Sequence, residues 1–250
     1  LCPAAHLADM VRGGCRVEVR VNRPMRLLVL DIEAAVLPGV SAIRLPKVES
    51  AGEVQRVSEL ILELENERGL APFSIGLQAL IETPAGLLAA ASIARADPRL
   101  TSIGLGCLDL AAACGFAASV ENLAAPSQMV VVAARAAGIK ARGLAGAVGN
   151  FSDLEAFRQL ARRSRLMGLT EGGAIHPSQV PILNEEFGVS EVEIHQAQEI
   201  LAMAQLHFSQ GVGAFAYRGQ MIDRPIVEAA RHTLAIAEAV VAARDRLSVT

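Results

Sequence analysis

Short apolar runs that alternate with longer amphipathic stretches are the feature that most limits the folds open to this chain. Each short run is rich in Val, Ile and Leu and is bounded by Gly, Pro or a charged residue, which is typical of a buried strand. Alternation of strands and helices favours right-handed βαβ units around a parallel sheet. The predicted strands span residues 17–21, 42–46, 74–81, 101–105, 143–148 and 172–175.

Helix starts are marked by capping residues between these strands. A Ser followed three residues later by Glu predicts a capping box, in which each side chain binds the other residue's backbone N–H. Thr83 followed by Pro84 indicates a helix start by another route, a cap residue with Pro in the first turn. The three Ser–Glu pairs are Ser50 with Glu53, Ser152 with Glu155 and Ser190 with Glu193.

A closed barrel of the TIM type, (β/α)8, fits this alternation better than a dinucleotide-binding fold. No Gly-x-Gly-x-x-Gly or Walker loop follows a predicted strand, and the turn at 104–106 lacks the third glycine. The chain has about the right length for such a barrel, but its pattern supplies six strands where closure needs eight. We therefore expect an α/β barrel that is incomplete at its N-terminal side.

The last third of the chain changes character. Residues 190–208 predict one amphipathic helix, residues 210–214 form a Gly-rich link, and a long helix follows from about 225 to 244. With no strand after them, these two helices are expected to form an appendage. We expect residues 1–188 to form the barrel domain and residues 189–250 a helical appendage that packs on a neighbouring subunit.

Charge and composition argue against several function classes. The net charge is −3, Trp is absent and Tyr occurs once, which disfavours a nucleic-acid-binding surface. The mean hydropathy is +0.38, yet no apolar run reaches the roughly 20 residues that a membrane-spanning helix needs. The four cysteines form no Cys-x-x-Cys pair, and no signal peptide is recognisable at the start. We expect a cytoplasmic protein without nucleic-acid or membrane partners.

Two carboxylates follow neighbouring predicted strands. Glu82 ends one strand, and Asp109 follows the next. The carboxyl ends of barrel strands meet at one mouth, so this pair is suited to hold Mg²⁺ together with water and substrate oxygens. Alternatively, Glu82 is a solvated strand end and Asp109 caps the following helix. Their occurrence at two adjacent strand ends favours the metal site.

Three further side chains are open to two interpretations each. Arg20 is either an inward-facing clamp for a carboxylate or an exposed residue of an edge strand. His176 is either a base or ligand, or a structural turn residue before Pro177. Cys107 has no evident His partner, which makes a thiolate nucleophile the weaker interpretation.

Six segments of the chain stand out as motifs: VRVN (19–22), LPKVES (45–50), LIETPAG (80–86), IGLGCLDLA (103–111), AIHPSQV (174–180) and GQMIDRP (219–225). Together they resemble the citrate lyase β-subunit-like family, which includes citryl, malyl-CoA and citramalyl-CoA lyases within the Mg-dependent aldolases. The resemblance covers most of the chain in order, although the family's first two strands have no counterpart.

The resemblance implies a trimer-forming TIM barrel in which Glu82 and Asp109 are Mg²⁺ ligands. It implies that Arg20 and Glu82 bind the substrate and that Arg20 and Asp223 are catalytic. Asp223 would act as an acid or base in the active site of a neighbouring subunit. An Asp just before Pro225 is also a good helix N-cap, and the local sequence does not separate the two roles.

The predicted function is a Mg-dependent carbon–carbon lyase acting on a 3-hydroxyacyl thioester of the citryl-, citramalyl- or malyl-CoA type. Its products would be acetyl-CoA and a 2-oxo acid, so coenzyme A is part of the substrate. Two alternatives stay open. One is a pyruvate-type aldolase for free hydroxy-oxo acids, against which the appendage and GQMIDRP argue. The other is a degenerate or partner-dependent subunit that binds without catalysing.

Overall fold

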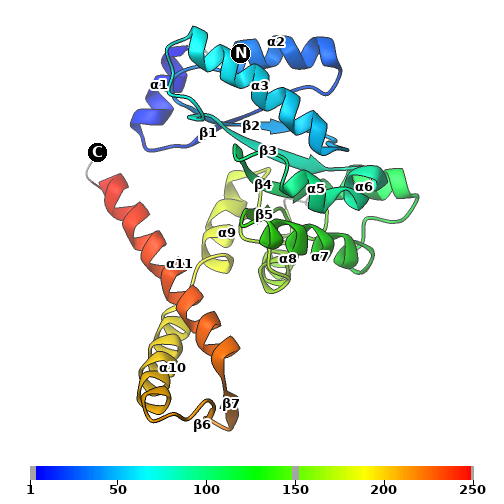
Figure 1. The fold of residues 1–250 in the computed structure, drawn as a ribbon. Helices are drawn as coiled ribbons and strands as arrows, with labels where there is room; N and C mark the ends of the chain where they lie inside the picture. The colour runs from blue at the N-terminus through cyan, green and yellow to red at the C-terminus, as the bar shows by residue number, and fades with distance from the viewer. Residues whose placement is uncertain (1–3, 148–151, 249–250) are drawn as a thin grey trace. The chain divides into compact units, whose positions relative to one another are not determined.

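The fold was obtained as a computed structural model that describes residues 4–147 and 152–248. The chain divides into two compact units, Leu1–Leu183 and Asn184–Thr250. Each unit is described by itself (Figure 1). In the described ranges, no helix has the length and apolar character needed to cross a membrane.

The first unit is built around a five-stranded parallel sheet with the order β1-β2-β3-β4-β5. This confirms the predicted α/β class. Spatial order follows chain order, so each strand returns beside its predecessor through a crossover, as in α/β barrels. The strands are β1 (Val17–Arg20), β2 (Val40–Leu45), β3 (Gly76–Ile81), β4 (Leu100–Leu105) and β5 (Lys140–Arg142).

Helices precede, connect and follow these strands (Figure 1). Most cover the convex face of the sheet, where Ile43, Leu77 and Ile103 are completely buried. A buried strand face covered by helices explains the near-continuous apolar runs in the sequence. The elements are α1 (Ala4–Arg12), α2 (Met25–Ala35), α3 (Ala51–Glu67), α4 (Pro84–Leu88), α5 (Ala90–Ala94), α6 (Cys107–Cys114), α7 (Val120–Ala136), α8 (Leu154–Leu166), the 3₁₀ turn η1 (Pro177–Gln179) and α9 (Val180–Glu186).

Local capping determines where several of these helices begin. The Ser50 hydroxyl accepts the Glu53 N–H at the start of α3, and the Thr83 hydroxyl accepts the Gly86 N–H at the start of α4. Both predicted helix starts are therefore confirmed. The Glu53 carboxylate accepts the N–H of Glu49 rather than that of Ser50, so the predicted capping box forms only in its first half. The N-cap of helix α8 is instead Asp153, which makes the predicted cap at Ser152 wrong by one residue. The carboxylate of Asp153 accepts an N–H from the first turn, as the hydroxyl was expected to do.

The sheet curves strongly around a polar interior. The Arg142 guanidinium on β5 donates to both carboxylate oxygens of Glu18 on β1, at 2.9 Å each. In a flat sheet, four strand spacings of about 4.8 Å would separate these backbones by about 19 Å, more than the two side chains span. Arg44 and Gln78, from the strands between, also donate to Glu18. The sheet is therefore a curved wall, concave on its charged face.

Two of the six predicted strands are wrong. Strand β5 lies just before the predicted segment 143–148, whose described part is irregular and whose residue 148 lies outside the described ranges. Gly143 has a φ of +124°, which no regular strand adopts. At 172–175 no strand forms, and a single bridge pairs Arg142 with Glu171. Both segments are apolar and rich in Gly, and for that reason their sequences resemble those of buried strands.

A buried ion pair stabilises the amino edge of the sheet. The side chains of Glu65, on α3, and Arg99, just before β4, are both 0% exposed. Two guanidinium nitrogens lie 2.8 Å from the two carboxylate oxygens. The backbone N–H groups of Phe73 and Ile75 donate to the same carboxylate at 2.9 Å each. This network ties α3 to the loops that lead into β3 and β4.

The second unit contains two long helices, α10 (Glu191–Ser209) and α11 (Arg224–Ser248), joined by an antiparallel hairpin of β6 (Phe215–Tyr217) and β7 (Gln220–Ile222). Both helices and the capping box at Ser190 are confirmed. The hairpin was not predicted. Its small core contains Ala204, Phe215, Ile222 and Val227.

Candidate metal and substrate site

The carboxyl ends of four adjacent strands bring four charged side chains to one edge of the sheet. Arg20 is the last residue of β1, and Glu82 directly follows β3. Lys47 lies two residues after β2, and Asp109 lies in the first turn of α6, after β4. Parallel strands share this edge, so three residues proposed from the sequence occupy one end of the wall. We call these four residues the carboxyl-edge cluster.

Glu82 is the buried member of the cluster, with 7% of its surface exposed. One of its carboxylate oxygens accepts the backbone N–H of Lys47 at 2.8 Å. The side chain passes directly over Gly106, where an added Cβ would lie 2.3 Å from the Glu82 Cγ. The turn after β4 therefore needs glycine so that Glu82 can occupy its place.

The electrostatic environment of Glu82 leaves room for more positive charge. Burial raises the pKa of the Glu82 carboxyl above its usual value, and the nearby Asp109 carboxylate raises it further. The Lys47 N–H and the charges of Lys47 and Arg20 act in the opposite direction without reversing the shift. Lys47 and Arg20 thus stabilise the charged form of Glu82 only in part, so a further cation near this carboxylate would be favourable.

Asp109 forms an ion pair with Lys47, whose Nζ lies 2.9 Å from the Asp109 Oδ1. The Asp109 and Lys47 side chains are 50% and 43% exposed. The pair raises the pKa of the Lys47 ammonium. Asp109 does not cap α6, because the N-cap residue is Gly106 and no side chain caps that helix. The helix-cap interpretation of Asp109 is therefore wrong.

The cluster fits a hard divalent cation. Mg²⁺ is usually held by one or two carboxylates, with water or substrate oxygens completing an octahedron. Glu82 and Asp109 supply those carboxylates, and the Lys47 ammonium is already bound to Asp109 as a stand-in cation. In the described ranges, no group of three or more His, Cys, Asp and Glu side chains is arranged to hold a metal. The two carboxylates thus match a metal whose remaining coordination positions are filled by water or substrate oxygens.

Arg20 is exposed, and in register it lies beside Arg44 of β2. Among the described residues, its guanidinium has no hydrogen-bond or ion-pair partner. Its charge nevertheless acts on Glu82. The N–H donors of the Arg20 guanidinium are thus available to a substrate anion at the carboxyl edge. A side chain that binds a carboxylate bidentately requires such available donors.

His176 and Cys107 have structural roles in this fold. The His176 ring caps η1 by accepting the Ser178 N–H, and its Nδ1 lies 2.8 Å from the Ser178 hydroxyl. The Cys107 thiol donates to the Leu144 carbonyl at 3.0 Å. Burial raises the pKa of Cys107 to about 11, so the nucleophilic thiolate is disfavoured at neutral pH.

Asp223 lies in the second unit, directly before α11. Its carboxylate is 3.5 Å from the Ile226 nitrogen, and its carbonyl accepts the Val227 N–H at 3.1 Å. This geometry is that of a helix N-cap with a long side-chain contact. Capping does not occupy both carboxylate oxygens, and the role of Asp223 in a neighbouring active site stays a prediction.

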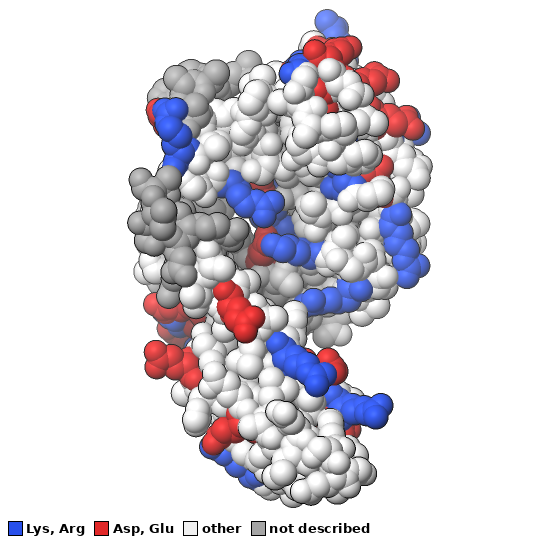
Figure 2. All heavy atoms as spheres, turned by 60° about the vertical axis from the view of Figure 1, so that its left-hand side comes forward, with Lys and Arg blue, Asp and Glu red and all other residues white. Residues whose placement is uncertain are grey.

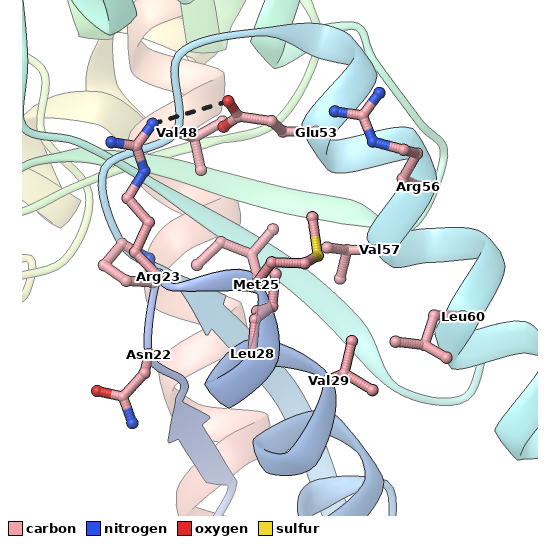
Figure 3. Close-up of a pocket in the computed structure, with 12 residues that line it drawn as sticks. Asn22, Arg23, Met25, Leu28, Val29, Val48, Glu53, Arg56, Val57 and Leu60 are labelled. Atoms are coloured by element: carbon pink, nitrogen blue, oxygen red, sulfur yellow. Dashed lines mark ion pairs between the residues drawn. The ribbon is translucent and has the colours of Figure 1, made fainter.

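A cavity of about 320 Å³ opens between α2 and α3, beside the carboxyl edge (Figure 3). Met25, Leu28 and Val57 form apolar walls, and an ion pair between Arg23 and Glu53 lies at its rim. The cavity adjoins the cluster because its lining includes the residues on both sides of Lys47. Apolar walls with few polar groups are typical of small-molecule sites.

Lys47 is the cluster member that our sequence reasoning did not single out. It lies in the LPKVES segment and follows a correctly predicted strand, as Glu82 does. Applying the strand-end rule to cations as well as carboxylates would have found it. On the face drawn in Figure 2, several Lys and Arg side chains gather around a few partly covered Asp and Glu side chains.

The sequence is similar to that of known lyases over most of its length. The sequence profile of the HpcH/HpaI aldolase/citrate lyase family matches residues 3–177. The L-malyl-CoA/beta-methylmalyl-CoA lyase of Rhodobacter capsulatus is 36% identical over 203 residues, which are 74% of this chain and 63% of that protein. Citrate lyase subunit beta of Escherichia coli is 32% identical over 212 residues, 84% of this chain and 70% of that protein. The chain thus spans just under two thirds of the length of the Rhodobacter lyase.

Solved structures give the same result. CitE of Mycobacterium tuberculosis, in complex with magnesium, acetoacetate and coenzyme A, matches with a TM-score of 0.67 and 28% identity, over 89% of this chain and 77% of that one. A citrate lyase of Burkholderia xenovorans has a TM-score of 0.77 at 22% identity, over 91% of this chain and 73% of that one, and supports the fold alone. From the profile match and the identities, the chain belongs to the HpcH/HpaI aldolase/citrate lyase family.

Proposed function

We propose that this protein is a Mg²⁺-dependent lyase that cleaves a carbon–carbon bond in a 3-hydroxyacyl thioester. Substrates of the citryl-, citramalyl- or malyl-CoA type would give acetyl-CoA and a 2-oxo acid. The observation that carries the proposal is the pair of carboxylates, Glu82 and Asp109, at neighbouring strand ends with Arg20 at the same edge. Relatives named as malyl-CoA lyase and citrate lyase subunit beta support the reaction class.

In this proposal, Glu82 and Asp109 hold Mg²⁺, which when bound supplies Lewis-acid stabilisation of the negative charge that develops on the substrate oxygen. Arg20 binds the substrate carboxylate through two parallel N–H donors and fixes its orientation. Asp223 of a neighbouring subunit takes up or delivers a proton at the carbon next to the thioester. The complex of CitE with magnesium, acetoacetate and coenzyme A supports this ligand set.

The cavity between α2 and α3 favours a thioester over a free hydroxy-oxo acid. A small free acid would be held by the cluster alone. A thioester carries a long arm, and the apolar walls of Met25, Leu28 and Val57 would remove part of such an arm from water. Arg56 lines the cavity and has no partner among the described residues, so it could meet an anionic group on that arm.

We also propose a closed (β/α)8 barrel and a homotrimer in which residues 189–250 pack on a neighbouring subunit. The curvature that brings Glu18 within hydrogen-bonding distance of Arg142 supports closure, because further strands would continue the same wall. Cys15, Cys107 and Cys114 are free thiols, which supports a reducing, cytoplasmic location.

The test is an assay of acetyl-CoA release from citryl-, citramalyl- and malyl-CoA, with Mg²⁺ and after its removal by EDTA. We expect at least one thioester to be cleaved only in the presence of the metal. Cleavage that survives EDTA would contradict the metal mechanism. Turnover of free hydroxy-oxo acids without turnover of thioesters would instead assign the protein to the pyruvate-type aldolases.

A further inference from the structure

Lys47 contacts both carboxylates of the cluster, through two different groups. Its backbone N–H donates to Glu82 at 2.8 Å, and its ammonium lies 2.9 Å from Asp109. The first contact belongs to the main chain and survives any change of side-chain rotamer. The second is at the end of a flexible, partly exposed stem and can be exchanged. One residue thus combines a fixed anchor with a movable charge.

The backbone of Lys47 is held in an unfavourable conformation. Its φ is +51°, in the left-handed region that residues with a Cβ seldom adopt. Such a conformation persists where the surroundings determine it, and it concentrates at functional sites. At this φ the N–H points to Glu82 while the side chain reaches Asp109. The positive-φ conformation therefore allows Lys47 to bind both carboxylates at once.

A divalent cation would change the charge balance of the carboxyl-edge cluster. Glu82 and Asp109 carry two negative charges, and Lys47 and Arg20 carry two positive ones, so the cluster is neutral by itself. A divalent cation between the carboxylates would compete with the Lys47 ammonium for the Asp109 oxygen. It would also repel the ammonium at close range. The exposed ammonium is the group that can move away.

We propose that Lys47 is an exchangeable counter-cation that neutralises Asp109 in the metal-free protein and leaves it when the divalent cation binds. The released ammonium then binds a carboxylate of the substrate, beside Arg20. The inference rests on the proposed function, because it requires the metal and an anionic substrate at this edge. Because the Lys47 backbone stays anchored to Glu82, the released ammonium remains near the cluster. There it can form a charge-assisted hydrogen bond with an incoming anion, and no further buried group has to lose its hydration.

The experiment uses calorimetric titrations of the whole chain and its variants Lys47→Met and Lys47→Gly. Both variants remove the ammonium and keep the N–H to Glu82, and glycine adopts a positive φ freely. An exposed ion pair of ordinary strength predicts Mg²⁺ binding about two- to fivefold tighter in both variants. Pyruvate, a 2-oxo acid probe, is then titrated into the Mg²⁺-saturated proteins. Both Lys47 variants should bind it several-fold more weakly than the wild type does.

The control is Lys140→Met, which removes the same charge from an ion pair with Glu171 outside the cluster. It should change neither affinity. Opposite changes for metal and pyruvate distinguish an exchangeable ammonium from a purely structural lysine, whose loss would weaken both ligands or neither. Unchanged or weaker Mg²⁺ binding in both Lys47 variants would overturn the inference, as would tighter Mg²⁺ binding with unchanged pyruvate affinity. Wild-type protein that bound no Mg²⁺ would overturn the proposed function as well.

Discussion

Replacing Glu65 by Gln tests how much the buried ion pair contributes to the stability of the first unit. The substitution preserves shape but removes the charge that compensates Arg99, whose side chain is 0% exposed. The carboxylate also accepts the N–H groups of Phe73 and Ile75 and the Ser74 hydroxyl. An amide has a single acceptor oxygen, so several of these donors would lose their partner.

Breaking a buried pair from one side leaves an unpaired charge in the interior and costs about 3–5 kcal/mol. For a domain of this size, that corresponds to a fall in melting temperature of about 6–20 °C. The matched control is Glu63→Gln on the exposed face of the same helix. Its effect should lie within about 0.5 kcal/mol of zero.

The pH dependence gives a second test. Burial alone would raise the pKa of Glu65, but the hydrogen bonds from Arg99, Ile75 and Phe73 outweigh it and lower the pKa. A carboxyl whose folded pKa is lowered stabilises the protein fully above its unfolded value of about 4.3. That contribution is lost as the pH falls through the lower folded value. The difference between wild type and Glu65→Gln should therefore narrow in acid.

Urea denaturation followed by circular dichroism measures both effects. A free energy of unfolding for Glu65→Gln within about 0.5 kcal/mol of wild type at pH 7 would refute the reasoning, because surface substitutions produce changes of that size. The double variant Glu65→Leu with Arg99→Met removes both charges but also the acceptor of the Phe73 and Ile75 N–H groups. It should therefore remain less stable than the wild type, because these donors lose their partner.

Three further predictions concern the site. Gly106→Ala should weaken Mg²⁺ binding in calorimetry, because its Cβ would lie 2.3 Å from the Glu82 Cγ, whereas Gly173→Ala, with no atom within 4 Å, should not. Arg20→Lys keeps the charge but loses the bidentate fork, so pyruvate should bind at least about tenfold more weakly, and unchanged affinity would make Arg20 a surface charge. Mixing inactive Asp223→Asn and Arg20→Ala subunits should restore some lyase activity if the active site is shared. Mixtures that exchange subunits and stay inactive would contradict that role.

The parts of the fold that local sequence determines were predictable. Strand and helix patterns and helix caps depend on neighbours a few residues apart in the sequence. The structure contains the predicted caps at Ser50, Thr83 and Ser190. Glu82 and Asp109 could be assigned to one edge for the same reason. Once two neighbouring strands are parallel, the residues that follow them share an edge.

The features that were missed depend on distant contacts or unusual backbone conformations. The hairpin between β6 and β7 turns at Arg218 and Gly219, both with positive φ, and Arg-Gly is a weaker signal for such a turn than Asn-Gly. Lys47 donates its N–H to Glu82 from a backbone with positive φ, a conformation that a Lys in the sequence does not indicate. The pairing of Glu65 with Arg99, 34 residues away, leaves no periodic trace in the sequence.

The contact between Glu18 and Arg142 has a consequence for the order of events during synthesis. The two residues are 124 positions apart, so at about 5–20 residues per second the partner of Glu18 is made roughly 6–25 s later. Arg44, only 26 positions away, can neutralise Glu18 during that interval. The first strands can therefore pair early around a provisional partner, while the wall reaches its final curvature only after β5 has left the ribosome. Contacts of such long sequence separation slow folding, so the curvature of this sheet is set last.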